Sequence, residues 1–237
     1  MATGNSTRLR FGYACGSLVT GTFTTLPGLL LLPYLTDTLG VSAALAGAVI
    51  LIPKAWAVLL APFAGRTSDR TYRRRGSRRT YVLGGGLSAT AAFATMLSGV
   101  ADGTAGMVWT GLGFLLTATA FAFFQAAYTA LPADIAHTPH DRIRLVSGRV
   151  AGIAVAALAV GSAGPAVVEA GGGGIDGHRW AGLFGAVVIA AGTLGVHLGT
   201  ARPPRTTARR PGRSSCAAGR RRTGCRGVLR TGGGPVS

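Results

Sequence analysis

The feature that most constrains this chain is an abrupt change from an apolar run to a cluster of arginines. Residues 41–65 carry a single charged side chain, Lys54, and the next 15 residues carry seven arginines against one acid, Asp69. A membrane helix leaves the bilayer on the cytoplasmic side with this pattern, because basic residues are retained there. We therefore expect this stretch to cross a membrane and its arginines to lie at the cytoplasmic surface.

Other stretches are as poor in charge as this one, and each supplies the roughly 20 residues that a transmembrane helix needs. Only 13% of the residues are charged, whereas a soluble domain usually carries about 25%. The pattern predicts an all-α integral membrane protein with six transmembrane helices in a domain at 11–200, after a short cytoplasmic segment at 1–10. The expected spans are 11–36, 40–65, 80–101, 106–132, 148–168 and 180–200.

Basic and acidic residues alternate between successive connections. The connections expected on one side carry nearly all of the arginines outside the spans, and those on the other side carry Asp37, Asp102, Glu169 and Asp176. Because positive charge marks the cytoplasmic side, we expect a multi-pass protein of the plasma membrane with both termini in the cytoplasm. This distribution explains the net charge of +17 without nucleic acid, so the lipid bilayer is an expected partner and nucleic acid is not.

The segment at 201–237 differs in composition from everything before it. It is rich in arginine, glycine, proline, serine and threonine, and it contains no acid. Such a segment cannot bury enough apolar surface to fold, and we expect it to be disordered. Two interpretations remain: a contact with lipid headgroups, or a GC-rich coding sequence read out of frame, which we favour.

Lys54 is the one charged side chain deep within an expected span. Placing an ammonium group near the bilayer centre costs roughly 2.5–3.5 kcal/mol on insertion scales, so such residues usually face a protein interior or a water-filled cavity. The alternative is that Lys54 extends toward the outer surface, the nearer of the two. Its neighbour Trp56 is either a ring that stacks on a ligand or a packing residue.

The segment after this span has a recognisable spacing: Gly65, Asp69 and Arg70, followed by Arg75, Gly76, Arg78 and Arg79. An acid beside several guanidinium groups can form charge-assisted bonds that break and re-form as helices move. The spacing resembles the signature between the second and third helices of the major facilitator superfamily. This resemblance implies that these seven residues form a conformational latch, hereafter the arginine latch.

A second set of motifs narrows the resemblance. Tyr128 to Pro132 and the run from Arg142 to Arg149 look like the end of helix four and the start of helix five in the glycoside–pentoside–hexuronide:cation symporters. Similar motifs are Phe11-Gly12-Tyr13, Leu35 to Gly40 and Pro53-Lys54-Ala55-Trp56. The resemblance covers about residues 10–200 and implies one half of a twelve-helix transporter that moves a sugar-like solute with a cation by alternating access. It implies solute contacts at Lys54, Trp56, Tyr128 and Arg149, although Arg149 also reads as an anchor at the head of its span.

The chain departs from that family where the coupling cation, Na⁺ or H⁺, would bind. Helix two of the family usually carries acids at positions that here hold Ala57 and Ala61, and the acid near Phe124 is also missing. Because hard cations prefer charged oxygen ligands, we expect the site for the coupling cation to have lost its ligands. We expect impaired coupling.

No catalytic constellation, metal site or cofactor motif is recognisable, and an enzyme is not expected. The expected function is transport by a truncated half-transporter, which lacks its C-terminal half or pairs as a homodimer. The alternative is a non-transporting membrane scaffold or an inactive gene remnant.

Overall fold

A computed structural model describes residues 3–75, 78–99, 103–135 and 138–200. Six long α-helices dominate these residues, and a five-residue π-helix follows the first of them. The fold is therefore all-α, as the sequence predicts. The helices are α1 (Thr3–Pro33), α2 (Ala43–Arg75), α3 (Arg79–Met96), α4 (Gly103–Ile135), α5 (Pro139–Ala170) and α6 (Gly174–Gly199), and the π-helix η1 spans Tyr34–Thr38.

Several helices extend well beyond the charge-free intervals of the sequence. α2 continues to Arg75 rather than ending near residue 65, and α5 begins at Pro139 rather than near residue 148. A charge-free interval measures only the hydrocarbon layer, whereas a helix rich in arginine, a good helix former, can continue into the headgroups and water. Asp69 and Arg70 therefore lie in the last turns of a helix and not in a loop.

Helix α3 is the shortest of the six, with 18 residues, and it ends at Met96 rather than near residue 101. Its end coincides with Gly99, whose φ of +59° favours glycine. From α6, Arg179 donates hydrogen bonds to the carbonyl oxygens of Ser98 (2.6 Å) and Gly99 (2.8 Å), and so holds the turn that follows α3. Tertiary contacts thus set this boundary.

In the part of the chain that the structure describes, five helices are long and apolar enough to cross a membrane. They are segments of α1, α2, α4, α5 and α6, and α3 falls outside this group because its 18 residues are less apolar. Small residues dominate α3, and its buried stripe runs through Val82, Gly86, Ala89, Phe93 and Met96. The third expected span is therefore a helix built for close packing rather than for high hydropathy.

Two other helix boundaries have clear local causes. The Thr138 side chain caps α5 by accepting a hydrogen bond from the Asp141 amide (3.1 Å), and Pro139 occupies the first helical position. Between α5 and α6, Gly172, Gly173 and Gly174 all have positive φ. The glycine run is therefore the tight turn that reverses the chain.

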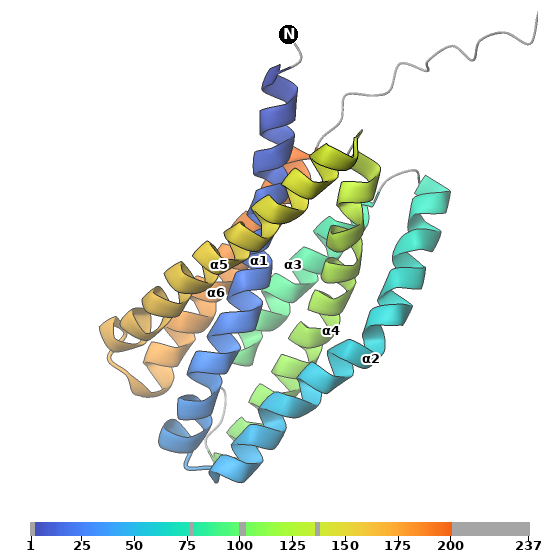
Figure 1. The fold of residues 1–237 in the computed structure, drawn as a ribbon. Coiled ribbons are helices and arrows are strands. Elements are labelled where there is room, and N and C mark those ends of the chain that lie inside the picture. The colour runs from blue at the N-terminus through green and yellow to red at the C-terminus, as the bar shows by residue number, and fades with distance from the viewer. Residues whose placement is uncertain (1–2, 76–77, 100–102, 136–137, 201–237) are drawn as a thin grey trace, which may run out of the picture. The chain divides into compact units, whose positions relative to one another are not determined.

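The six helices pack as two related sets of three (Figure 1). α1 packs against α5 and α6, and α4 packs in the same way against α2 and α3, while α3 and α6 pack against each other. Equivalent helices are three positions apart in the chain, and successive helices alternate in direction, so α1 and α4 run in opposite directions. This arrangement is an inverted repeat of the kind found in many transporters.

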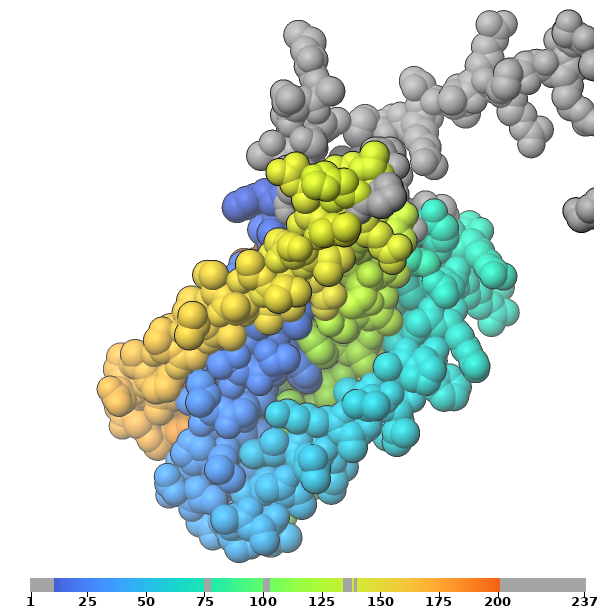
Figure 2. All heavy atoms as spheres, viewed as in Figure 1, coloured from blue at the N-terminus to red at the C-terminus, as the bar shows by residue number. Residues whose placement is uncertain are grey.

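One face of the bundle displays α1, α2, α4 and α5 (Figure 2). Most residues in the apolar parts of α2 and α5 are exposed, whereas α1 and α4 are about half buried. In a bilayer, exposed apolar side chains can face lipid or another protein surface. Polar groups on this face are better indicators of function, because lipid tails offer them no hydrogen bonds.

Large aromatic side chains fill the space between α1 and α4. Stacked or tilted rings follow one another along this interface, with neighbouring centroids 3.9–6.4 Å apart. Each contributes both buried area and ring-to-ring attraction. The rings belong to Tyr13, Tyr128, Phe124, Phe121, Phe23 and Phe114.

Candidate solute-contact site and arginine latch

Three polar side chains of α4 form hydrogen bonds with residues of two neighbouring helices, α1 and α2. The Thr119 hydroxyl accepts from Trp56 Nε1 of α2 (3.2 Å), and Gln125 Oε1 accepts from the Thr20 hydroxyl of α1 (3.2 Å). Tyr128 donates to the Tyr13 carbonyl oxygen of α1 (2.7 Å). Since an α-helix rises 1.5 Å per residue, these contacts extend over ~13 Å of α4.

Tyr128 and Arg149, two of the predicted solute contacts, lie together at the junction of α1, α4 and α5. The Arg149 guanidinium carbon stacks 5.0 Å from the centroid of the Tyr128 ring, a cation–π geometry. Tyr128 is fully buried and also stacks on Tyr13. Ser17 joins the cluster by donating to the Arg149 carbonyl oxygen (3.1 Å).

The helix boundaries argue against the interpretation of Arg149 as an anchor at the head of α5. It lies ten residues after Pro139, which places it ~15 Å inside α5 rather than at its head. Its Nε is buried without a hydrogen-bond partner among the described residues. A buried guanidinium N–H of this kind is a donor that a polar ligand or a water molecule could use.

Lys54 and Trp56, the other two predicted contacts, leave α2 in different directions. Side chains two residues apart on an α-helix point about 200° apart. Trp56 reaches α4 through Thr119, whereas Lys54 is exposed and has no hydrogen bond or ion pair to a described residue. The structure therefore does not gather the four predicted contacts into one cluster.

Carboxylates lie only toward the ends of the described helices. Asp37 is in η1, Asp69 is in the last turns of α2, and Glu169 is next to the end of α5. Lys54 instead lies 11 residues from the start of α2, or ~16 Å along it. The exposed face thus presents a cation at a depth where it presents no carboxylate.

In the described part of the arginine latch, an ion pair connects α2 to the start of α3. Arg78 Nη2 lies 2.5 Å from Asp69 Oδ1, and the Arg78 guanidinium also stacks over the ring of Tyr72 at 4.8 Å. The Arg78 side chain is mostly buried, with 11% exposed, against 62% for Asp69. The buried arginine therefore holds an acid that water still reaches.

A second latch residue contacts a different helix. Arg79 donates to the carbonyl oxygen of His197 near the C-terminal end of α6. A cation is favourable there, because the helix dipole and the free carbonyl groups are both negative. Neighbouring arginines thus connect the start of α3 to α2 on one side and to α6 on the other.

Of the remaining latch residues, the structure describes the side chain of Arg70 and the surroundings of Gly65. Arg70 is exposed, and a Cβ at Gly65 would have no atom within 4 Å. Gly76 and the Arg75 side chain lie outside the described residues. In the described part, the latch geometry therefore rests on Asp69, Arg78 and Arg79.

Sequence reasoning missed the contacts that Thr20, Thr119 and Gln125 make. Threonine is common in the first, third and fourth spans, and nothing in a single sequence separates a threonine that points to a neighbour from one that bonds to its own helix. Gln125 alone carried a signal, as an uncharged polar residue in an otherwise apolar run of α4. Such residues inside a membrane usually find a partner on another helix.

Comparison with known proteins identifies the family of this chain. A family profile described as MFS/sugar transport protein matches residues 12–224, which is most of the chain. The chain belongs to this family of the major facilitator superfamily (MFS). The resemblance that the motifs at Asp69 and Tyr128 indicate is therefore confirmed.

Curated relatives of this MFS chain are symporters and a carrier. The putative glycoside/cation symporter YagG of Escherichia coli is 26% identical over 182 residues, which cover 76% of this chain and 39% of the relative. An uncharacterized symporter of Synechocystis sp. is 36% identical over 130 residues, covering 51% of this chain and 24% of the relative. The glucuronide carrier protein homolog of E. coli is 28% identical over 146 residues, covering 61% and 32%.

The chain spans well under half the length of these relatives, between 24% and 39% in the aligned parts. The family and the all-α, multi-pass architecture show a membrane protein of the MFS symporter type. What the complete relatives transport is a property of those proteins.

Proposed function

We propose that this MFS chain forms one wall of a path for a sugar-like solute of the glycoside class, and that a second six-helix unit forms the other wall. The relatives' names support the solute class. The inverted repeat supports movement by alternating access, in which such units rock around a central site.

The single observation that carries this proposal is the exposure of Lys54 in the middle of α2. An ammonium group facing lipid at this depth is unfavourable by several kcal/mol, so the face that holds it must be covered by water, solute or protein. A second six-helix unit over this face would enclose a water-filled cavity. That unit is a second copy of this chain or a separate C-terminal half.

Within this path we assign different roles to the four predicted contacts. Lys54 donates to solute hydroxyl or carboxylate oxygens, because three N–H donors on a flexible stem suit polar ligands. Tyr128 and Arg149 lie nearer the arginine-rich end and contribute the buried Arg149 donor. Trp56 positions α2 against α4 through Thr119.

We further propose that the arginine latch works as a conformational switch. The ion pair between Asp69 and Arg78 and the hydrogen bond from Arg79 to α6 form in the state described here. Each contact joins two helix ends through a single arginine side chain, so a rocking motion can break it without disrupting a helix. They would favour one of the two access states.

Coupling to Na⁺ or H⁺ is expected to be impaired. The middle of each described helix lacks a carboxylate, and hard cations need several oxygen ligands. The solute would therefore move down its own gradient, or exchange with solute on the other side, rather than accumulate against a gradient.

Reconstitution of the full chain into proteoliposomes tests these points. Labelled glycosides and hexuronides are followed in counterflow, and then under an imposed Na⁺ or H⁺ gradient. We expect counterflow without gradient-driven accumulation, and loss of counterflow in Lys54→Ala but not in Leu51→Ala, a matched change at an exposed residue of α2. Absence of counterflow for every sugar, in a chain that remains folded, would favour the scaffold or remnant alternative. Accumulation driven by a cation would contradict impaired coupling.

The orientation is tested separately by labelling. In a chain whose three native cysteines are replaced by serine, a cysteine at position 73 and one at position 104 are treated with a membrane-impermeant maleimide. We expect only the cysteine at position 104 to react in intact cells, because the arginine-rich side should be cytoplasmic. Reaction of both from outside would contradict this orientation.

A further inference from the structure

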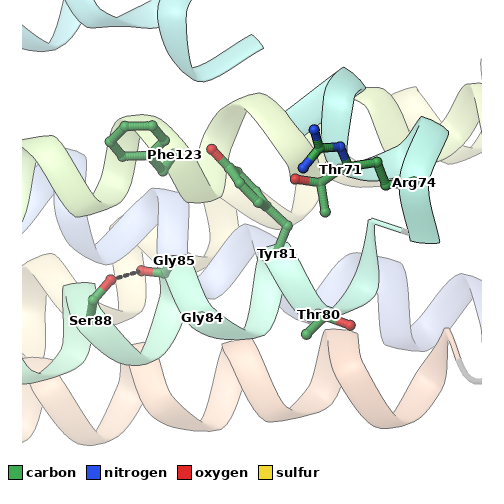
Figure 3. Close-up of a pocket in the computed structure, with 8 residues that line it drawn as sticks. All are labelled: Thr71, Arg74, Thr80, Tyr81, Gly84, Gly85, Ser88 and Phe123. Atoms are coloured by element: carbon green, nitrogen blue, oxygen red, sulfur yellow. Dashed lines mark hydrogen bonds between the residues drawn. The ribbon is translucent and has the colours of Figure 1, made fainter. Parts of the chain in front are cut away.

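A cavity of about 530 Å³ lies between the C-terminal end of α2, Phe123 of α4 and the first half of α3. Figure 3 shows the Tyr81 side chain rising from α3 between Phe123 of α4 and the residues Thr71 and Arg74 of α2. None of these residues belongs to the proposed solute path or to the arginine latch. The volume of the cavity is in the range of ligand-binding pockets.

One end of the cavity is cationic. Arg74 is exposed and has no ion-pair partner among the described residues, so its five N–H donors remain for a ligand. The nearby hydroxyl groups are largely occupied: Thr71 donates to the carbonyl oxygen of Thr67, and Tyr81 bonds to the Thr67 hydroxyl (2.6 Å). Arg74 is therefore the group that would hold an anion.

The other end of the cavity is apolar, and no side chain projects into it from Gly84. The rings of Tyr81 and Phe123 meet edge to face, with centroids 6.2 Å apart. Gly84 lies on the cavity wall, and a Cβ placed there would have no atom within 4 Å. A flexible apolar chain can therefore lie directly against the backbone of α3.

Gly84 differs from its two neighbours in this respect. A Cβ at Gly85 would lie 2.9 Å from the Phe124 backbone nitrogen, and one at Gly86 would lie 2.3 Å from Thr193 Cγ2. Helix packing therefore explains the absence of side chains at Gly85 and Gly86. At Gly84 the missing side chain leaves open space, which the cavity uses.

We propose that this cavity binds an anionic phospholipid from the leaflet on the arginine-rich side. The phosphate group pairs with Arg74, and an acyl chain lies against Gly84 and Phe123. A lipid fits better than a small anion because the cavity combines a cationic end with an apolar one. The apolar stretch of α2 ends at Gly65, and Arg74 follows nine residues later in the same helix, on the arginine-rich side where the phospholipid headgroups lie.

Lipid retention by the purified full chain tests the proposal directly. Native mass spectrometry would compare phosphatidylglycerol with phosphatidylcholine of the same acyl chains. We expect about a fivefold preference for phosphatidylglycerol, the ratio that corresponds to the contribution of about one basic residue near a membrane surface. Arg74→Gln should abolish this preference.

Two further variants distinguish lipid binding in the cavity from nonspecific electrostatic attraction of lipid to the arginines. Arg73→Gln removes the same charge one residue away, at an exposed position outside the cavity wall, and should retain the preference. Gly84→Leu fills the apolar end and should lower retention of both lipids at least fivefold, from the steric block.

Three results would overturn the proposal. Equal losses in Arg73→Gln and Arg74→Gln would show diffuse electrostatic attraction. Displacement of phosphatidylglycerol by millimolar inorganic phosphate would show a plain anion site. Equal retention of the two lipids by the unaltered chain would show no headgroup recognition. Since no solute is involved, these results are independent of the transport proposal.

Discussion

Three consecutive glycines of α3 provide a sharp test of the packing described here. Replacing each with alanine adds one methyl group, and the structure places the three methyl groups in different surroundings. At Gly84 the new Cβ meets nothing within 4 Å, at Gly85 it lies 2.9 Å from backbone, and at Gly86 it lies 2.3 Å from Thr193 Cγ2. All three variants gain the same helix propensity, about 0.8–1.0 kcal/mol.

Because this propensity term is shared, differences between the variants isolate the steric cost. Carbon atoms in good contact are about 3.5–4.0 Å apart, so the Gly86→Ala methyl group overlaps Thr193 by more than 1 Å. Thr193 cannot move easily, because it is fully buried, β-branched and bonded to the Ile189 carbonyl oxygen (2.8 Å). Overpacking of this kind costs about 1–3 kcal/mol.

We therefore expect Gly86→Ala to be about 1–3 kcal/mol less stable than Gly84→Ala. Gly85→Ala should fall on the same side as Gly86→Ala, because a backbone atom cannot turn away. The measurement is the free energy of unfolding of the full chain in mixed micelles, from a sodium dodecyl sulfate titration followed by circular dichroism. Gly84→Ala itself should match or exceed the unaltered chain.

A double variant provides the control. Thr193→Ala removes Cγ2 and Oγ1, the two atoms nearest the new methyl group, and leaves Cβ 2.9 Å from it. In the Gly86→Ala background it should therefore restore part of the lost stability relative to the sum of the two single changes, with a coupling energy of about 0.5–3 kcal/mol, the usual range for residues in contact. Equal stabilities of Gly84→Ala and Gly86→Ala, or strict additivity with Thr193→Ala, would refute the close packing of α3 on α6.

Other contacts give smaller or more local effects. Asp69→Asn should change the unfolding free energy by only about 0.2–1 kcal/mol, because Asp69 is mostly exposed and its pair with Arg78 is screened; a loss above 2 kcal/mol in the same titration would contradict this. Tyr128→Phe should cost about 0.5–1.5 kcal/mol, because it deletes one buried hydrogen bond and keeps the ring, whereas Tyr128→Ala should cost about 3–5 kcal/mol. A reversed order would refute the aromatic packing. Arg179→Gln should speed amide hydrogen exchange in the turn after α3, whose carbonyl groups Arg179 binds, but not at the start of α4; uniform acceleration would indicate global destabilisation.

The sequence by itself determined the class of protein, the all-α fold and the family. Hydropathy and charge are properties of short stretches, so they can be read without knowing what packs against what. The same holds for the motifs around Asp69 and Tyr128, whose order and spacing were sufficient to indicate the MFS. The helix ends were less predictable, because arginine-rich turns of α2 remain helical outside the hydrocarbon layer.

Only the tertiary structure decided what each side chain faces. Lys54 and Trp56 are close in sequence, yet the helix turns them apart. Tyr128 and Arg149 lie on different helices, yet they stack. Among the arginines whose side chains the structure describes in this segment, Arg78 pairs with Asp69 and Arg79 contacts α6. These outcomes depend on the angle around each helix axis and on neighbours that are far away along the chain, and neither is written in local composition.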